Sequence, residues 1–134
     1  IAAALSLVVA QRLARKNCSL CSVEDIDAMK NSKLLRSLGL TSEKASRAVI
    51  YKGKGCPPNT SGGCGGSGYK GRIGIYEILE IGKELKSAIL SGMSQTELKS
   101  LSQKNGFISM QESAHELLLS GEISVEEFQR VFSF

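Results

Sequence analysis

The feature that most constrains this chain is the arrangement of its four cysteines in two close pairs. Two residues separate Cys18 from Cys21, seven separate Cys56 from Cys64, and 34 residues lie between the pairs. A two-residue gap lets two thiolates turn toward one point, and two such corners form a tetrahedral sulfur cage that suits Zn²⁺. Four thiolates also leave no coordination position for water. The pattern therefore predicts one structural zinc ion, held by Cys18, Cys21, Cys56 and Cys64.

The second cysteine pair has a longer spacing than an ordinary zinc knuckle. We expect Gly62 and Gly63 to fold the extra residues outward, so that Cys64 returns to the site. The alternatives are disulfides or buried free cysteines. Because Ile1–Ala10 lacks the basic segment of a signal peptide, we expect reduced thiols and metal binding.

Length and composition allow one modest domain or two small subdomains. The 134 residues are 42% hydrophobic and 22% charged, which is ordinary for a globular protein. The formal net charge of +4 permits an anionic partner without requiring nucleic acid. The apolar run Ile1–Ala10 is too short to span a bilayer, and we expect it to pack against a domain that precedes this chain.

The spacing of apolar residues predicts a mainly α-helical chain with a small antiparallel β-hairpin. Apolar residues recur at helical spacing from Leu5 to Leu13, so we expect a helix over Ile1–Ala10. Periodicity leaves open whether Gln11–Lys16 continues this helix or forms a strand. Three further short helices are expected, over Val23–Ser32, Lys33–Leu38 and Glu43–Val49.

The middle of the chain predicts a loop followed by a strand. Residues 56–71 are dominated by Gly, Pro, Ser and Asn, which is typical of loops. Arg72–Ile81 then alternates, with Ile73, Ile75 and Leu79 on one face. That alternation predicts a half-buried strand.

The remaining residues predict a helical subdomain with repeated start signals. Three segments match the capping box, in which a serine and a glutamate satisfy backbone amides at a helix start: Ser94-x-x-Glu97, Ser109-x-x-Glu112 and Ser124-x-x-Glu127. A glycine stands where each preceding helix is expected to stop. Together these signals predict helices near residues 83–91, 94–105, 109–120 and 124–132.

Few other residues suggest chemistry. The single histidine, His115, is interpreted as a surface residue rather than a ligand or a catalytic base. The chain has no phosphate-binding P-loop, because Gly82-Lys83 is followed by glutamate and no glycine stands five residues before Gly82. Arg72, at the start of the predicted strand, is either a solvated hairpin residue or a guanidinium that grips phosphate or carboxylate.

These motifs together resemble the C-terminal part of the type II secretion and type IV pilus assembly ATPases, which are hexameric RecA-like motors. The resemblance covers essentially the whole chain. The matching residues are Ser6–Lys16, the two cysteine pairs, Gly68–Glu80 (GYKGRIGIYEILE) and the helical tail Leu85–Val131. The chain departs from the family pattern in the expanded Cys56–Cys64 spacing, and in Ser113 and Ala114, which stand where the family has Asp-Gly.

The resemblance implies a domain organisation. Residues 1–16 would end the RecA-like ATPase core, residues 17–69 would form an inserted tetracysteine zinc module, residues 70–81 would return to the core, and residues 82–134 would form the C-terminal helical subdomain. Gln11–Lys16 would then be a strand that pairs with Arg72–Leu79.

The resemblance also implies a function for the parent protein. Arg72 matches a family arginine that contacts nucleotide phosphate in the assembled hexamer. The Walker motifs would precede Ile1, so ATP and Mg²⁺ would bind only in the full-length parent, and this chain alone is expected to be catalytically inactive. The implied partners are five further copies and an inner-membrane platform protein, at the cytoplasmic side of that membrane, with no nucleic acid.

The main alternative is a zinc-ribbon module that binds nucleic acid. Its contact patch would be Lys52, Lys54, Tyr69, Lys70 and Arg72. The mild net charge and the acidic residues of the tail argue against this alternative.

Overall fold

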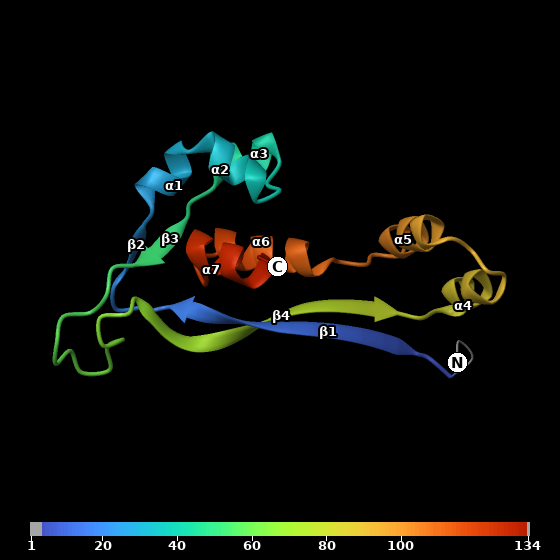
Figure 1. The fold of residues 1–134 in the computed structure, drawn as a ribbon, viewed down its shortest axis with the longest axis horizontal. Coiled ribbons are helices and arrows are strands. Elements are labelled where there is room, and N and C mark those ends of the chain that lie inside the picture. The colour runs from blue at the N-terminus through green and yellow to red at the C-terminus, as the bar shows by residue number, and fades with distance from the viewer. Residues whose placement is uncertain (1–3, 134) are drawn as a thin grey trace. The chain divides into compact units, whose positions relative to one another are not determined.

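A computed structural model describes residues 4–133 of the chain (Figure 1). Within those residues the chain forms four strands and seven helices. The strands are β1 (Leu7–Asn17), β2 (Ser22–Glu24), β3 (Tyr51–Gly53) and β4 (Tyr69–Glu80). The helices are α1 (Ile26–Lys30), α2 (Ser32–Ser37), α3 (Ser42–Arg47), α4 (Lys83–Leu90), α5 (Gln95–Lys104), α6 (Met110–Leu119) and α7 (Val125–Phe132). The expected mainly helical chain with a small antiparallel sheet is confirmed.

The two long strands, β1 and β4, pair with each other and run in opposite directions (Figure 1). The expected alternation of β4 is confirmed, since Ile75 is fully buried while Arg72, Tyr76 and Ile78 are exposed. Their pairing agrees with the strand that the resemblance implied for Gln11–Lys16. A RecA-like core around this sheet stays a prediction.

The expected helix over Ile1–Ala10 is wrong where the structure describes it. Strand β1 begins at Leu7, and residues 4–6 are not helical; Ile1–Ala3 lie outside the described residues. Pairing with β4 provides hydrogen-bond partners for the backbone amides and carbonyls of β1. The pairing continues beyond the start of β1, where the Ile81 amide donates to the Ser6 carbonyl at 2.9 Å. Val8 and Val9 are β-branched and fit a strand better than a helix. The helical spacing of apolar residues was therefore misleading.

Strands β2 and β3 were not expected from the sequence. They pair antiparallel, with Val23 opposite Lys52, and the three short helices α1–α3 lie between them in the chain. The three expected short helices are thus confirmed in number but not in length, because Val23 belongs to β2. Gly39 adopts a φ of 84° just after α2, as expected for a helix stop.

The four expected tail helices are confirmed as α4–α7. Ser94 and Glu97 form a reciprocal capping box, and Ser109 and Glu112 make the same pair of hydrogen bonds. At α7 only half of the capping box forms. The Ser124 hydroxyl accepts from the amide of Glu127, but the Glu127 carboxylate binds Arg15 instead of the Ser124 amide.

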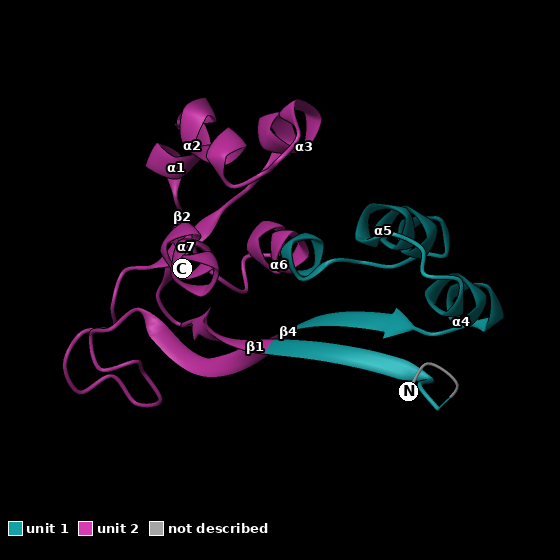
Figure 2. Cartoon of the chain, turned by 45° about the vertical axis from the view of Figure 1, so that its right-hand side comes forward, with its two compact units in different colours: residues 1–11, 76–113 teal, residues 12–75, 114–134 magenta. Residues whose placement is uncertain are grey.

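The described chain divides into two compact units, coloured separately in Figure 2. One contains the residues up to Gln11 together with Tyr76–Ser113, and its buried side chains include Ile81 and Leu85. The other contains residues from Arg12 to Ile75 and from Ala114 onward. Its core includes the fully buried side chains of Leu35, Ile50, Ile75, Leu118 and Ile123. The domain limits drawn from the sequence remain a prediction, and no helix within residues 4–133 is long and apolar enough to cross a bilayer.

Candidate metal centre

The four cysteines converge at the junctions between strands and loops. Cys18 directly follows β1, Cys21 directly precedes β2, and Cys56 and Cys64 lie in the loop between β3 and β4. Their four Sγ atoms all lie within 4.8 Å of one another. The Sγ atoms of Cys18 and Cys56 are 3.7 Å apart, and so are those of Cys21 and Cys64.

This donor set fits a structural zinc ion. None of the four cysteines forms a disulfide bond. With Zn–S bonds of about 2.3 Å, a tetrahedral site requires sulfur–sulfur distances of about 3.8 Å, close to the two short separations. Cys18 and Cys56 are buried, whereas Cys21 and Cys64 are half-buried. The residues therefore suit a closed, four-thiolate site, although the identity of the metal is a proposal.

The long second spacing closes through a pair of turns. The Thr60 amide donates to the Pro57 carbonyl at 3.3 Å, and the Gly63 amide donates to the Thr60 carbonyl at 2.9 Å. Gly62 has a φ of 70°, which favours glycine. A Cβ on Gly63 would stand 3.0 Å from the Cys56 Cβ. The extra residues thus fold outward as expected, and Cys64 returns to the cluster.

Two glycines allow the backbone to close around the sulfurs. A Cβ on Gly53, at the end of β3, would stand 1.9 Å from the carbonyl oxygen of Gly68. That carbonyl accepts a hydrogen bond from the amide of Cys18 at 2.9 Å. The amides of Cys56 and Gly68 both donate to the Sγ of Cys64, each at 3.2 Å. These contacts place three of the four cysteines in one hydrogen-bonded framework.

The backbone environment favours a thiolate at Cys64. The hydrogen bond from the Cys56 amide lowers the pKa of Cys64 to about 6, assisted by the Gly68 amide and opposed by burial. At Cys56 a backbone hydrogen bond from Cys64 lowers the pKa, but burial and the neighbouring thiols outweigh it and raise the pKa to about 12. Unequal pKa values of this kind are expected when four sulfurs crowd together, and a bound dication stabilises every thiolate.

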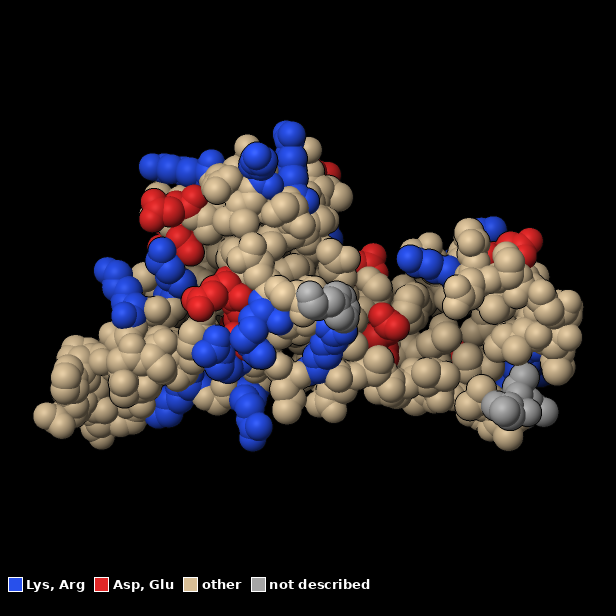
Figure 3. All heavy atoms as spheres, in the orientation of Figure 1, with Lys and Arg blue, Asp and Glu red and all other residues tan. Residues whose placement is uncertain are grey.

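Most residues of the alternative nucleic-acid patch are engaged within the protein. Lys52 forms an ion pair with Asp25 at 2.8 Å, and Lys70 donates to the carbonyl of Gly62. The Tyr69 hydroxyl is 3.0 Å from that of Ser124, and its ring lies under the Arg15 guanidinium. On the face shown in Figure 3, basic side chains are interspersed with acidic ones rather than forming one continuous patch.

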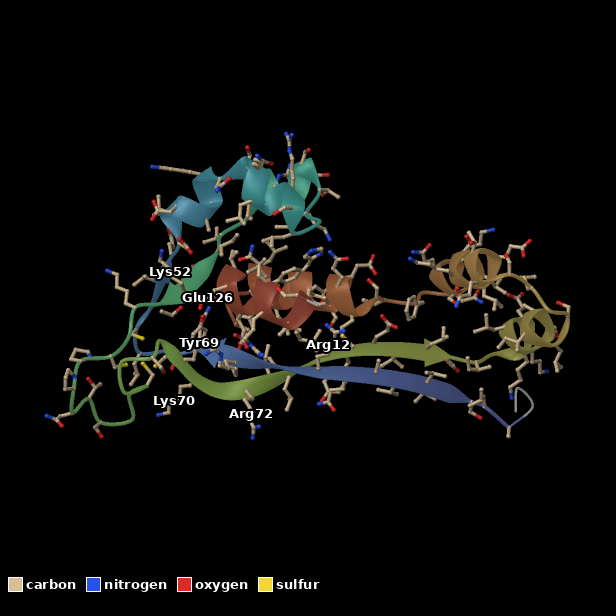
Figure 4. All side chains as sticks on the ribbon, in the orientation of Figure 1. Arg12, Lys52, Tyr69, Lys70, Arg72 and Glu126 are labelled. Carbon is tan, nitrogen blue, oxygen red and sulfur yellow. The ribbon has the colours of Figure 1, made fainter. Side chains whose placement is uncertain are left out.

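Arg72 stands apart from the cysteines on the exposed face of β4. Its side chain is exposed, and Figure 4 shows it projecting away from the ribbon. The loop that contains Cys56 and Cys64 carries no charged residue from Gly55 to Gly68. The side chain of Arg72 is therefore accessible from solvent, and its contact with nucleotide stays a prediction.

The interpretation of His115 as a surface residue is wrong. His115 is only 7% exposed, its Nε2 lies 2.7 Å from the Leu38 carbonyl oxygen, and its ring stacks on Phe128. The partners come from sequence positions 77 residues before and 13 residues after it. One local signal points to this burial: His115 stands three residues before Leu118, which is fully buried, so helical spacing places both on the same face of α6.

A buried ionic network was missed by the sequence analysis. Glu127 is fully buried, and its carboxylate accepts hydrogen bonds from the Arg15 guanidinium at 2.7 and 2.9 Å. Arg130 also donates to it, at 2.9 Å from Nε. The sequence signal at Glu127 was the capping box, which predicts a carboxylate that accepts from the backbone amide of Ser124. Only the long-range contact with Arg15 reveals the network.

Four thiols that converge from the ends of β1 and β2 and from the loop before β4, close enough to hold a metal ion, define the chain as a tetracysteine module joined to helices. Comparison with known proteins then identifies the family: the chain matches the family described as type II/IV secretion system protein over residues 1–130, and it belongs to that family.

The relatives include ATPases of type IV pilus assembly and of type II secretion. The chain is 39% identical to the type IV pilus assembly ATPase PilB of Thermus thermophilus, over 95% of this chain and 13% of the relative. It is 37% identical to the type IV pilus assembly ATPase TfpB of Acinetobacter baylyi, over 97% of this chain and 21% of the relative. It is 35% identical to the type II secretion system ATPase E of Vibrio cholerae, over 68% of this chain and 16% of the relative. The chain therefore spans only about an eighth to a fifth of the length of these relatives.

Proposed function

We propose that this chain supplies a structural zinc module and a helical subdomain to a hexameric ATPase that powers type II protein secretion or type IV pilus assembly. The observation that carries this proposal is the family match over residues 1–130, whose named relatives are ATPases of these two machines. Relatives from both machines match this chain, and either machine is consistent with the match.

The zinc ion has a structural role in this proposal. Bound zinc supplies a cross-link among four thiolates, with no open position for chemistry. The segment from Gly55 to Gly68 holds no large apolar side chain, so it has little hydrophobic core of its own. Metal binding would order this loop, because structural zinc contributes roughly 10–16 kcal/mol of apparent binding free energy in small metal-dependent folds.

ATP binding belongs to the longer protein rather than to this chain. The 134 residues contain no P-loop, which would supply the backbone amides that cradle phosphate. Within the hexamer, Arg72 would contact the nucleotide phosphates, and its exposed position on β4 leaves it accessible. A planar guanidinium suits this role because it can bind two phosphate oxygens at once.

The proposed setting is the cytoplasmic face of the inner membrane. There the hexamer would act on a membrane platform protein and move it at the expense of ATP. The nucleic-acid alternative is less well supported, because Lys52, Tyr69 and Lys70 already have partners within the protein.

The decisive experiment uses the full-length protein that carries this chain. We expect zinc-dependent hexamers that hydrolyse ATP, and no gel shift of DNA or RNA at 150 mM salt. A protein that lacks ATP turnover but binds nucleic acid with a steep salt dependence would overturn the proposal in favour of the zinc-ribbon alternative.

A further inference from the structure

Asn17 lies where β1, β3 and the end of α6 meet, one residue before Cys18. Its side-chain amide donates to the carbonyl of Gly121 at 2.9 Å and to the carbonyl of Tyr51 at 3.2 Å. Its backbone amide donates to the carbonyl of Glu122 at 2.8 Å. One buried residue thus joins the strand that leads into the metal centre to the turn between α6 and α7 (residues 120–124).

The same framework continues from Asn17 to the sulfurs. The amide of Cys18 donates to the carbonyl of Gly68, whose own amide donates to the Sγ of Cys64. On the β3 side, the amide of Lys54 donates to the carbonyl of Cys21 at 3.0 Å. On the β4 side each step is a peptide link or a direct hydrogen bond, and on the β3 side the strand itself connects Tyr51 to Lys54. A displacement of Asn17 would therefore reach both cysteine pairs.

Hydrophobic packing alone does not explain an asparagine at position 17. The residue is 7% exposed, and its Oδ1 is a buried atom for which residues 4–133 provide no hydrogen-bond partner. An unsatisfied buried acceptor costs about 1–3 kcal/mol. A leucine of similar size would avoid that cost but could not donate. The side-chain amide of Asn17 supplies two hydrogen bonds that an apolar residue could not supply.

The turn that Asn17 holds is itself packed against β3. Gly121 has a φ of 80°, and a Cβ at this position would stand 2.7 Å from the ring of Tyr51. Tyr51 is also the residue whose carbonyl Asn17 holds. The turn after α6, β3 and Asn17 therefore form one tightly fitted cluster, which a change at any of its members would disturb.

We propose that Asn17 is a positioning residue that couples the metal centre to the turn between α6 and α7. Metal binding orders Cys18 and with it Asn17, which holds the turn and the start of α7. By reciprocity, the order of the turn strengthens metal binding. This inference rests on the proposed zinc site. In metal centres generally, residues that hydrogen-bond to the ligands or to their neighbours hold those ligands in place, and we assign this role to Asn17.

The first test compares two neighbouring substitutions in the full-length protein. Asn17→Leu removes both donated hydrogen bonds and should weaken zinc affinity at least about tenfold in competition with a chromogenic chelator. Lys16→Gln removes only the partly exposed ion pair of Lys16 with Glu122, at 2.9 Å. This ion pair is a weaker contact with the same turn, and its loss should change the affinity less than about twofold. Equal affinities for Asn17→Leu and the unmodified protein would overturn the coupling.

The second test needs no substitution, so it decides the matter even if Asn17→Leu fails to fold. Hydrogen exchange is followed in the unmodified protein with zinc bound and after its removal by a chelator. Residues 120–124 and the first turn of α7 should lose protection at least about tenfold, whereas α4 and α5 should not change. Unchanged exchange at residues 120–124 would overturn the inference while leaving zinc binding intact. An unmodified protein that binds no zinc would overturn both the zinc module and the coupling.

Discussion

The buried carboxylate of Glu127 accepts hydrogen bonds from both the backbone amide and the guanidinium of Arg15, 112 residues earlier in the chain. The amide lies 2.7 Å from Oε1, and the guanidinium nitrogens lie 2.7 and 2.9 Å from Oε2. One carboxylate thus binds both the backbone and the side chain of a residue in β1. This contact fixes the N-terminal turn of α7 against the strand that leads to the metal centre.

Glu127→Gln should destabilise the protein. The amide cannot accept from Arg15 and Arg130 as the carboxylate does, and it leaves two guanidinium groups without their counter-charge. Because Arg15 and Arg130 are about half exposed, we expect a loss of about 2 kcal/mol in the free energy of unfolding, less than for a fully buried pair. Urea denaturation measures it. Glu126→Gln, in the same turn of α7, should change stability by less than about 0.5 kcal/mol.

The stabilisation by Glu127 should depend on pH. Burial raises the pKa of Glu127, but the hydrogen bonds from Arg130 and Arg15 outweigh it and lower the pKa to about 2, from an ordinary 4.5. A depressed pKa gives stability that is complete above the unfolded-state pKa and is lost as pH falls toward the folded-state value. The stability difference between the unmodified protein and Glu127→Gln should therefore shrink between about pH 5 and pH 2. A difference that stays constant over this range would contradict the prediction.

The cysteine cluster should bind one zinc ion per chain. Elemental analysis should give a stoichiometry near one, and X-ray absorption should show four sulfur ligands at about 2.3 Å. Cys21→Ser should lower the zinc content after dialysis against a weak chelator to near zero, whereas Ser22→Ala should leave it unchanged. Full zinc retention by Cys21→Ser would exclude Cys21 as a ligand.

The close approach of Gly53 and Gly68 should be essential to the metal centre. In Gly53→Ala the new Cβ would meet the Gly68 carbonyl oxygen at 1.9 Å, and backbone cannot move as easily as a side chain. We expect a loss of at least about 2 kcal/mol in stability and weaker zinc binding. Gly82→Ala is the control for an added methyl group without a clash, because nothing lies within 4 Å of its Cβ position. Gly82 is the N-cap residue of α4, where alanine is less favourable, so we expect this control to lose less than about 1 kcal/mol. In thermal denaturation, Gly53→Ala should have a clearly lower melting temperature than Gly82→Ala.

Arg72→Lys in the full-length protein should lower ATP turnover at least about tenfold, equivalent to about 1.4 kcal/mol in the barrier. Lysine keeps the charge but loses the planar fork that binds two phosphate oxygens. Zinc content and hexamer assembly should remain normal. Lys70→Gln, two residues earlier on β4, should keep normal turnover. If Arg72→Lys also keeps normal turnover in intact hexamers, Arg72 is only a solvated residue of the strand.

Local signals in the sequence were sufficient for several parts of the fold. The serine caps before α5, α6 and α7 act over three residues, so they can be recognised without knowing the rest of the structure. The alternation of β4 and the outward fold of residues 57–63 likewise depend on neighbouring residues. The pairing of the cysteines was inferred from spacing alone, and the four sulfurs do converge.

Other features depend on contacts between distant residues, and only the tertiary structure decided them. β1 is a strand because β4, about 60 residues later, supplies its hydrogen-bond partner. His115 is buried because Leu38 and Phe128 enclose it, and Glu127 leaves the capping box because Arg15 and Arg130 offer it stronger, charged donors. A short-range pattern reports the preference of a segment by itself, whereas burial and pairing depend on which distant segment packs against it.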